Sequence, residues 1–140
     1  MNPKDPNFEA RVRKNFSEQK VMRLIGARLT KVTAGECEIV VLMREDLAQQ
    51  DGFMHAGIVT TVLDSACGYA AYTLMPESSR VLSVEFKVNL LAPAKGEIIR
   101  ASGGVKRAGK TLTVCTADAF ADNILCATML ATMICINGDA

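Results

Sequence analysis

The sequence predicts an α+β domain in which a curved antiparallel sheet wraps around one long central helix. The first observation behind this prediction is a stretch of small and aliphatic residues, about 57–74, that is apolar nearly all round. A helix of that kind must be covered on most sides. The second is a β-branched hairpin before this stretch, and the third is a series of four strand-like segments after it. A curved sheet is the economical cover for such a helix.

The chain is expected to begin with a short amphipathic helix. Apolar residues recur four positions apart from Phe8 to Phe16, which is a helical period, and the pattern breaks near Ser17. We expect residues 1–24 to form a helical segment that packs on a single domain made by residues 25–140.

A hairpin and the central helix are expected next. Residues 27–43 alternate and then become β-branched on either side of the turn Ala34-Gly35. The polar stretch 44–52 is predicted to be a loop. Pro76 ends the central helix, because the residue before a proline is pushed out of the helical region.

The second half of the chain is predicted to be an antiparallel meander. Its four strand segments are 81–92, 97–107, 111–121 and 125–136. Gly103-Gly104 inside the second segment predicts a bulge or a close backbone approach. One sheet of this size leaves part of the central helix open, so a second copy of the chain is expected to complete the cover.

Composition argues against several classes of partner. The net charge is +1, from 16 basic and 15 acidic residues, so no overall field favours nucleic acid or an anionic membrane. The content of aromatic residues is 5% and tryptophan is absent, which disfavours a base-stacking surface. The central apolar stretch could span a bilayer by length, but an acid at its centre makes that costly. We expect neither nucleic acid nor membrane as a partner.

Cysteine usage points to a reducing compartment. The five cysteines form no CxxC pair and their number is odd, so neither a disulfide framework nor a metal cluster is expected. Reduced, mostly buried thiols are typical of a cytoplasmic protein. The N-terminus is polar and has no apolar stretch, so no signal peptide is expected.

Asp64 is the one charged side chain between His55 and Glu77, in the middle of the central apolar stretch. Carboxylates are seldom buried without a partner, and burying one ionised costs several kcal/mol. Asp64 is therefore either used in chemistry or satisfied by nearby hydroxyls. The hydroxyls within reach on the same helix are those of Thr60, Thr61 and Ser65.

The surroundings of Asp64 resemble the active-site stretch of the PaaI-like group of hotdog-fold acyl-CoA thioesterases. The matching residues are Gln49, His55-Ala56-Gly57 and Asp64, followed by Val84-Glu85-Phe86, the run 89–96 with its Pro93, and Lys106 to Thr111. The likeness extends over roughly residues 25–136. It implies a hotdog fold and a hydrolase that cleaves CoA thioesters without a further cofactor or a metal.

Thioester hydrolysis explains the residue types. It needs a base that drives water, or a carboxylate nucleophile, and it needs donors for the oxyanion. The resemblance gives the first role to Asp64 and the donor role to the main-chain N–H of Ala56, at a helix start whose N–H groups lack partners. Gly57 would allow close approach of the substrate, and Gln49 would touch the carbonyl or the nucleophile.

The remaining candidates have weaker assignments. Ser83 matches a hydroxyl that can hold the attacking water, and His55 is expected to orient the loop rather than to act as the base. Gln50 would take the place of Gln49 after a loop shift of one residue. The cationic residues of a predicted hairpin tip would either meet the phosphates of CoA or simply be solvated; they are Lys106, Arg107 and Lys110.

The spacing of the candidates bears on assembly. Asp64 follows Ala56 by eight residues, which is roughly 12 Å of helical rise, so one carbonyl cannot easily touch both in one subunit. The resemblance implies that the acid comes from the partner, which gives two composite sites in a homodimer. The homodimer could in turn form a homotetramer.

Three functions are compatible with these residues. The first is an acyl-CoA thioesterase acting on an acyl or aryl-acyl thioester. The second is a hotdog hydratase, but only one histidine is present and the proline-containing loop of that group is absent. The third is a non-catalytic acyl-CoA binding or sensor module, because a fold does not fix a function. The sequence leaves the acyl group open between aryl and medium aliphatic.

Overall fold

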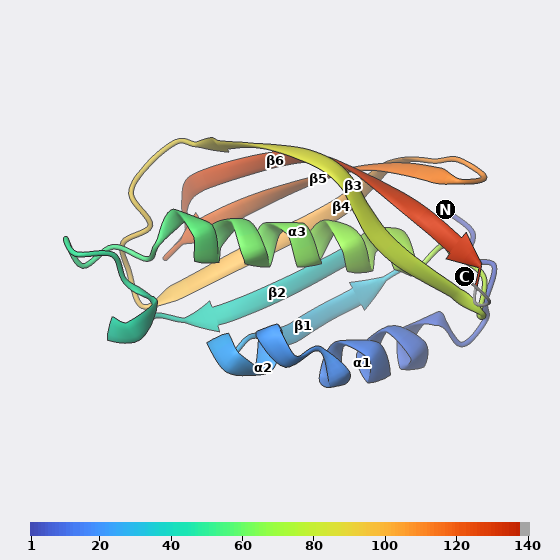
Figure 1. Cartoon of the computed structure of the whole chain (residues 1–140), viewed down its shortest axis with the longest axis horizontal. Coiled ribbons are helices and arrows are strands. Elements are labelled where there is room, and N and C mark those ends of the chain that lie inside the picture. Colours follow the sequence, from blue (N-terminus) through green and yellow to red (C-terminus); the bar gives the residue numbers. More distant parts are fainter. Residues whose placement is uncertain (138–140) are drawn as a thin grey trace.

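The central helix α3, Ala56–Tyr72, lies in the hollow of a curved six-stranded antiparallel sheet (Figure 1). The structure is a computed structural model that describes residues 1–137. The strands are β1 (Arg28–Thr33), β2 (Glu36–Leu42), β3 (Ser79–Leu90), β4 (Ile98–Ala108), β5 (Leu112–Ala121) and β6 (Ile124–Asn137). The predicted fold class is confirmed, and the elements begin and end within a few residues of their predicted bounds.

The order of the strands corrects one prediction. The sheet runs β1-β2-β4-β5-β6-β3, so β3 pairs with β6 at the edge and only β4, β5 and β6 form a meander. The segment 91–97 is a crossover rather than a hairpin turn. It starts at β6, where the N–H groups of Leu91 and Ala92 donate to the Cys126 carbonyl, and it ends beside β2, where the N–H of Met43 donates to the Glu97 carbonyl. This crossover lets β3 cover the side of α3 that a continuous meander would leave bare.

Two short helices precede the sheet and lie along its β1 side (Figure 1). They are α1 (Phe8–Glu18) and α2 (Lys20–Ile25), and Gln19 between them has an extended backbone. The predicted break near Ser17 therefore falls two residues later. Arg11 fastens α1 to the end of α3, because its Nη2 donates to the carbonyls of Tyr72 and Met75, at 3.1 and 2.9 Å.

The core is aliphatic and lies between α3 and the inner face of the sheet. Residues of β5 alternate between buried and half-buried, as expected of a strand with one covered face. The glycine pair of β4 marks a close approach: a Cβ on Gly103 would collide with the backbone of Ala66 in α3. The register shift of β4 lies further on, between Val105 and Arg107, so the glycine pair is not itself a bulge.

Candidate active site

The start of α3 presents a main-chain N–H group toward solvent. His55 caps the helix, and its Nδ1 accepts a hydrogen bond from the N–H of Gly57 at 2.8 Å. The N–H groups of Ile58 and Val59 donate to the His55 carbonyl, at 2.9 and 3.2 Å. In the part of the chain that the structure describes, the N–H of Ala56 has no acceptor, and Ala56 is exposed. Because the helix dipole adds partial positive charge there, this N–H suits an oxyanion.

The histidine orients the helix start through its side chain. A Cβ on Gly57 would lie 3.0 Å from Nδ1 and 3.2 Å from Cε1 of His55, so the glycine makes room for the capping imidazole. This is a reason for Gly57 other than the close substrate approach expected from sequence. The capping geometry supports the predicted positioning role of His55.

Gln49 lies in the loop before α3, and its side chain is held by the loop itself. Its Oε1 accepts hydrogen bonds from the N–H groups of Asp51 and Phe53, at 2.5 and 3.3 Å. With the amide oxygen occupied, the Nε2 of Gln49 remains as a donor. The neighbouring Gln50 is exposed.

Gln49 and Ala56 line one cavity of about 380 Å³ at this end of the helix. Apolar residues form most of its remaining wall, among them Val59, Leu90 and Pro93. Gln50 does not line this cavity. The structure therefore brings Gln49, and not Gln50, to the same space as the Ala56 N–H.

Asp64 and Ser83 meet at a second cavity, of about 250 Å³. The Oγ of Ser83 donates a hydrogen bond to Oδ1 of Asp64 at 2.6 Å. The Ser83 Oγ also lies 3.4 Å from the sulfur of Met133. Asp64 is half-buried. The apolar sequence around Asp64 suggested a carboxylate enclosed in the core. The structure instead places it at the wall of a cavity, with the Ser83 hydroxyl as its partner.

The hydroxyls of α3 that were alternative partners of Asp64 bond elsewhere. Thr60 donates to the Ala56 carbonyl and Thr61 to the Gly57 carbonyl, both at 2.8 Å. Ser65 donates to the Oε1 of Gln19 at 3.2 Å. The alternative in which these three hydroxyls satisfy the carboxylate is therefore wrong.

One chain holds the candidate site in two halves. Asp64 and Ala56 are eight residues apart on one straight helix, about 12 Å by helical rise, and they line different cavities. Asp64 has Ser83 beside it, whereas Ala56 has Gln49. A carbonyl bound at one half does not reach the other within the same chain.

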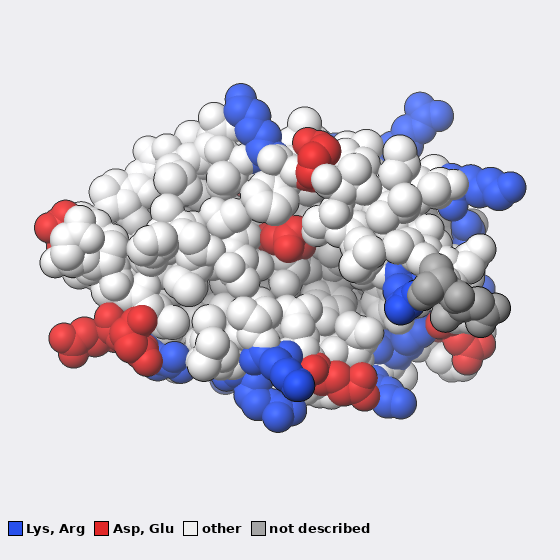
Figure 2. All heavy atoms as spheres, viewed as in Figure 1, with Lys and Arg blue, Asp and Glu red and all other residues white. Residues whose placement is uncertain are grey.

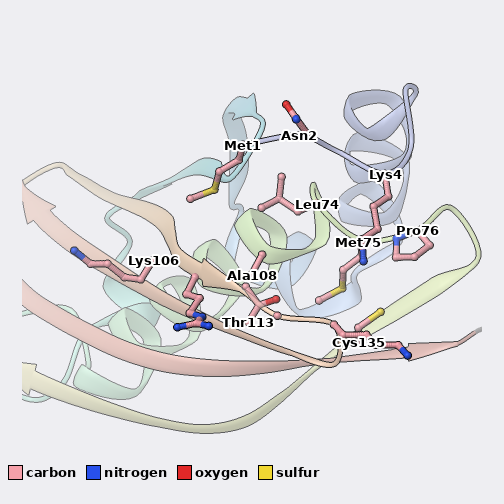
Figure 3. Close-up of a pocket in the computed structure, with 13 residues that line it drawn as sticks. Met1, Asn2, Lys4, Leu74, Met75, Pro76, Lys106, Ala108, Thr113 and Cys135 are labelled. Atoms are coloured by element: carbon pink, nitrogen blue, oxygen red, sulfur yellow. The ribbon is translucent and has the colours of Figure 1, made fainter.

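The predicted basic cluster lies at the other end of α3. Lys106, Arg107 and Lys110 are exposed at the β4–β5 hairpin, and together with Lys4 they line a cavity of about 460 Å³. Figure 3 shows Lys4 and Lys106 on opposite sides of this cavity, with Leu74 from the end of the helical region between them. The cavity is therefore a cationic hollow bounded by the N-terminal segment and the hairpin.

Other chemistry finds less support in the structure. Cys67 is completely buried, and this burial, more than its neighbours Cys115 and Asp64, raises the pKa of its thiol, so it does not suit a nucleophile. Over residues 1–137, no three His, Cys, Asp or Glu side chains gather where they could hold a metal ion. No helix in the same range is both long and apolar enough to cross a bilayer.

Comparison with known proteins decides the family. Residues 51–128 match the sequence profile of the Thioesterase superfamily. The chain belongs to that superfamily. The matched range includes the helix start, Asp64 and Ser83, and the assignment confirms the prediction of a thioesterase.

Relatives of this thioesterase agree in fold. It is 48% identical to a thioesterase family protein of known structure from Silicibacter pomeroyi, with a TM-score of 0.91 and coverage of 94% of this chain and 99% of that one. The Escherichia coli PaaI protein from the phenylacetic acid degradation operon is 13% identical, with a TM-score of 0.86 over 94% and 95% of the two chains. A Saccharolobus solfataricus protein named as an esterase, SSO1253, is 29% identical over 85% of this chain and 79% of its own length. These matches confirm the predicted likeness to PaaI-like hotdog thioesterases.

Sequence reasoning missed part of the cavity beside Asp64 in this thioesterase. Asn15 and Gln19 reach it from the N-terminal helices, and Gly68 and Tyr69 reach it from α3. Gly68 follows Asp64 by four residues, so helical periodicity could have placed it on the same face of the helix. Tyr69 follows by five residues and is not expected on that face from periodicity. No sequence signal pairs Gln19 with α3, because that contact depends on how the N-terminal segment packs.

Proposed function

We propose that this thioesterase hydrolyses an acyl thioester of coenzyme A to free acid and CoA, with Asp64 as general base or nucleophile. The observation that carries the proposal is the 2.6 Å hydrogen bond from Ser83 to Asp64 at the wall of a cavity. The bond fixes Oδ1 of the carboxylate. It leaves Oδ2 for a water molecule or for the thioester carbon.

Two routes balance with these groups. In the first, Oδ2 removes a proton from water while the water oxygen attacks the thioester carbon. In the second, Oδ2 attacks the carbon directly, and water then hydrolyses the resulting anhydride. In both routes the C–S bond breaks, its electron pair goes to sulfur, and the thiolate of CoA takes up a proton. Ser83 orients the carboxylate in either case and is placed to hold water.

The carbonyl oxygen requires donors that are fixed before the reaction begins. The N–H of Ala56 and the Nε2 of Gln49 line one cavity and are the donors that we assign to it. His55 holds this helix start in place through its hydrogen bond to Gly57. We assign His55 and Gly57 a positioning role.

We propose that the two halves of the site meet in a homodimer, so that Asp64 of one chain faces Ala56 of the other. Strand β3 supports this, because it is a long edge strand with apolar side chains in solvent: Leu82 is 56% exposed and Val84 53%. Such an edge is a template for pairing with another strand. Figure 2 shows that the face on which α3 lies carries few charged side chains, which gather at its margins. Pairing of dimers into a tetramer remains a further proposal.

The cationic hollow at the hairpin is proposed to bind the phosphates of CoA. Lys106, Arg107 and Lys110 supply the positive charge that phosphate groups require. Gln50, which is exposed next to Gln49, is a further candidate contact. All five cysteines are free, which supports a cytoplasmic location.

The test is a thiol-release screen over aryl and aliphatic acyl-CoAs with the wild-type protein and with Asp64→Asn. We expect release of free CoA from at least one thioester, and a rate at least about a hundredfold lower in the variant, as for loss of a general base. The variant should still bind the substrate, measured by calorimetry. Wild-type rates in Asp64→Asn on every active substrate would contradict the proposal.

A further inference from the structure

The turn between β5 and β6 places a carboxylate on the start of β4. Both oxygens of Asp122 accept the N–H of Glu97, Oδ1 at 3.1 Å and Oδ2 at 3.0 Å, and Oδ1 also accepts the N–H of Ile98 at 3.0 Å. The N–H of Asp122 donates in return to the Ile98 carbonyl at 3.0 Å. These bonds fasten the point where the crossover 91–97 enters β4.

The backbone on both sides of this contact is adapted to it. Asp122 has φ 44° and Asn123 has φ 71°, in the left-handed region that aspartate and asparagine tolerate better than most residues. On the other side, a Cβ built on Gly96 would collide with the carboxylate of Asp122. Gly96 also has φ 149°, which side-chain-bearing residues rarely adopt. The turn and the crossover are thus both shaped to bring the carboxylate onto the N–H groups.

The β5–β6 hairpin holds both ends of the crossover. The first two residues of the crossover 91–97 donate to the Cys126 carbonyl in β6, at 2.9 and 3.2 Å. At the far end Asp122 holds the N–H of Glu97, whose carbonyl accepts from Met43 at 2.8 Å. Asp122 therefore supplies the side-chain anchor of a segment that is otherwise held by main-chain bonds.

The middle of the crossover supports the start of α3. The carbonyl of Ala94 accepts the N–H of Met54 at 3.0 Å, two residues before Ala56. Ala94 and Met54 are both buried and line the cavity that contains the Ala56 N–H. Figure 1 shows the crossover beside the loop that leads into α3, at the same end of the molecule. The place of the crossover therefore sets both a wall of this cavity and the approach to the helix start.

We propose that Asp122 is a positioning residue for thioester hydrolysis, which acts through the crossover on the main-chain N–H of Ala56. The inference rests on the proposed function, which gives that N–H the oxygen of the thioester carbonyl. Asp122 does not line the cavity and is exposed, so it acts on the reaction by holding the crossover. The hydrogen bond to an oxyanion depends on distance and angle, and the charge that it stabilises develops in the transition state.

Substitutions within one turn separate the carboxylate from the turn itself. Asp122→Gly removes the carboxylate, whereas Asn123→Gly leaves it in place and changes an exposed neighbour. Glycine adopts a positive φ without a steric cost, so both variants should keep the turn. Asp122→Asn keeps Oδ1, the oxygen that accepts from both Glu97 and Ile98, and serves as the conservative variant.

Amide hydrogen exchange of Met54, followed by NMR, tests the anchor without a substrate. Exchange should be about fivefold to tenfold faster in Asp122→Gly than in the wild type, the effect of one lost hydrogen bond, and unchanged in Asn123→Gly. The N–H of Val105 provides an internal control. It donates to the Gly35 carbonyl at 2.9 Å, near the other end of α3, and should exchange at the same rate in all variants. The pair distinguishes local opening from a general loss of stability.

Thiol release from benzoyl-CoA and hexanoyl-CoA measures the effect on the reaction. In Asp122→Gly, kcat should fall at least about tenfold, because a small misplacement of a catalytic group is costly. KM should change less than about twofold, since the Ala56 N–H matters most in the transition state. Asp122→Asn should recover most of the lost kcat, and Asn123→Gly should match the wild type.

Three results would overturn the inference. Equal effects of the two glycine variants would show that the turn matters and the carboxylate does not. Faster exchange of Met54 and Val105 alike would show a general loss of stability. A wild-type kcat in Asp122→Gly would show that the helix start keeps its place without the anchor. Absence of turnover by the wild type would count against the proposed function, and the exchange of Met54 would still decide whether Asp122 holds the helix start.

Discussion

The hydroxyl of Ser83 donates a 2.6 Å hydrogen bond to Oδ1 of Asp64, and so connects the edge strand β3 to the middle of α3. The contact joins residues 19 positions apart in sequence. It makes one oxygen of the carboxylate an acceptor within the protein and leaves the other to the cavity. Because β3 is also the proposed dimer edge, assembly and the orientation of the carboxylate depend on the same strand.

If Ser83 acts through Asp64, the two residues should behave as one unit. Ser83→Ala should lower kcat about tenfold to a hundredfold with little change in KM, because it removes an interaction that matters in the transition state. The double variant Asp64→Asn, Ser83→Ala should be no slower than Asp64→Asn alone, which is the sign of coupled residues. Steady-state kinetics of the four proteins would measure this. Additive losses in the double variant would show that Ser83 has a role independent of Asp64.

The helix start and the acid could be predicted from sequence because each has a local signal. His55-Ala56-Gly57 stands where the apolar stretch begins, and the lone charge of Asp64 interrupts that stretch. The hydrogen-bond partner of Asp64 was harder to predict from sequence. Hydroxyls close in sequence were the obvious candidates, but each of them bonds to another acceptor. A strand from elsewhere in the fold supplies Ser83.

The position of β3 could not be predicted for a related reason. Turn residues such as Pro93 and Gly96 indicate that the chain changes direction, but they do not say which strand it joins next. The choice depends on long-range pairing, and β3 pairs with β6 along its whole length. The hydrogen bond that Nε2 of Gln19 donates to the Tyr69 hydroxyl could not be predicted either, because it depends on where the N-terminal helices pack.

The capping role of His55 predicts a difference between two substitutions. His55→Ala should reduce the free energy of unfolding by about 1 kcal/mol, the usual cost of a lost N-cap. It should also lower kcat, because the Ala56 N–H loses its support. His55→Asn should retain most of the stability and activity, since its side-chain oxygen can accept from Gly57. Urea unfolding and thiol release would measure both effects. Equal inactivation by Asn and Ala without loss of stability would instead indicate a chemical role.

The buried thiols predict a stability that falls in alkaline solution. Burial raises the pKa of Cys37 and of Cys115 to about 12, whereas a thiol in an unfolded chain has a pKa of about 8.5. Between these values the unfolded chain loses protons that the folded chain keeps. Stability is therefore fully present below about pH 8.5 and is lost as the pH rises toward 12.

This prediction can be isolated with one substitution. The free energy of unfolding of the wild type, minus that of Cys115→Ala, should fall by about 1 kcal/mol for each pH unit above about pH 9. Subtracting the variant removes the contribution of lysines and tyrosines, which titrate in the same range. Urea unfolding from pH 7 to pH 10.5 would provide the values. A difference that stays constant over this range would mean that the thiol at position 115 is hydrated in the folded protein.

The composite site predicts that two inactive variants restore activity when they are mixed. Asp64→Asn lacks the acid, and Ala56→Pro lacks the proposed oxyanion donor. Proline is tolerated at the first residue of a helix, and the extended backbone of His55, φ −57° and ψ 134°, is compatible with a following proline. Both variants should therefore fold as the wild type does, which circular dichroism and thermal unfolding would establish.

In a mixed dimer, one site combines Asp64 of the proline variant with Ala56 of the asparagine variant and is complete. The other site lacks both groups. When equal amounts are unfolded and refolded together, half of the dimers are mixed, so about one quarter of wild-type activity should return. Each variant refolded alone should stay inactive. If the acid and the donor served the same site within one chain, every site in the mixture would lack one of them, and no activity would appear.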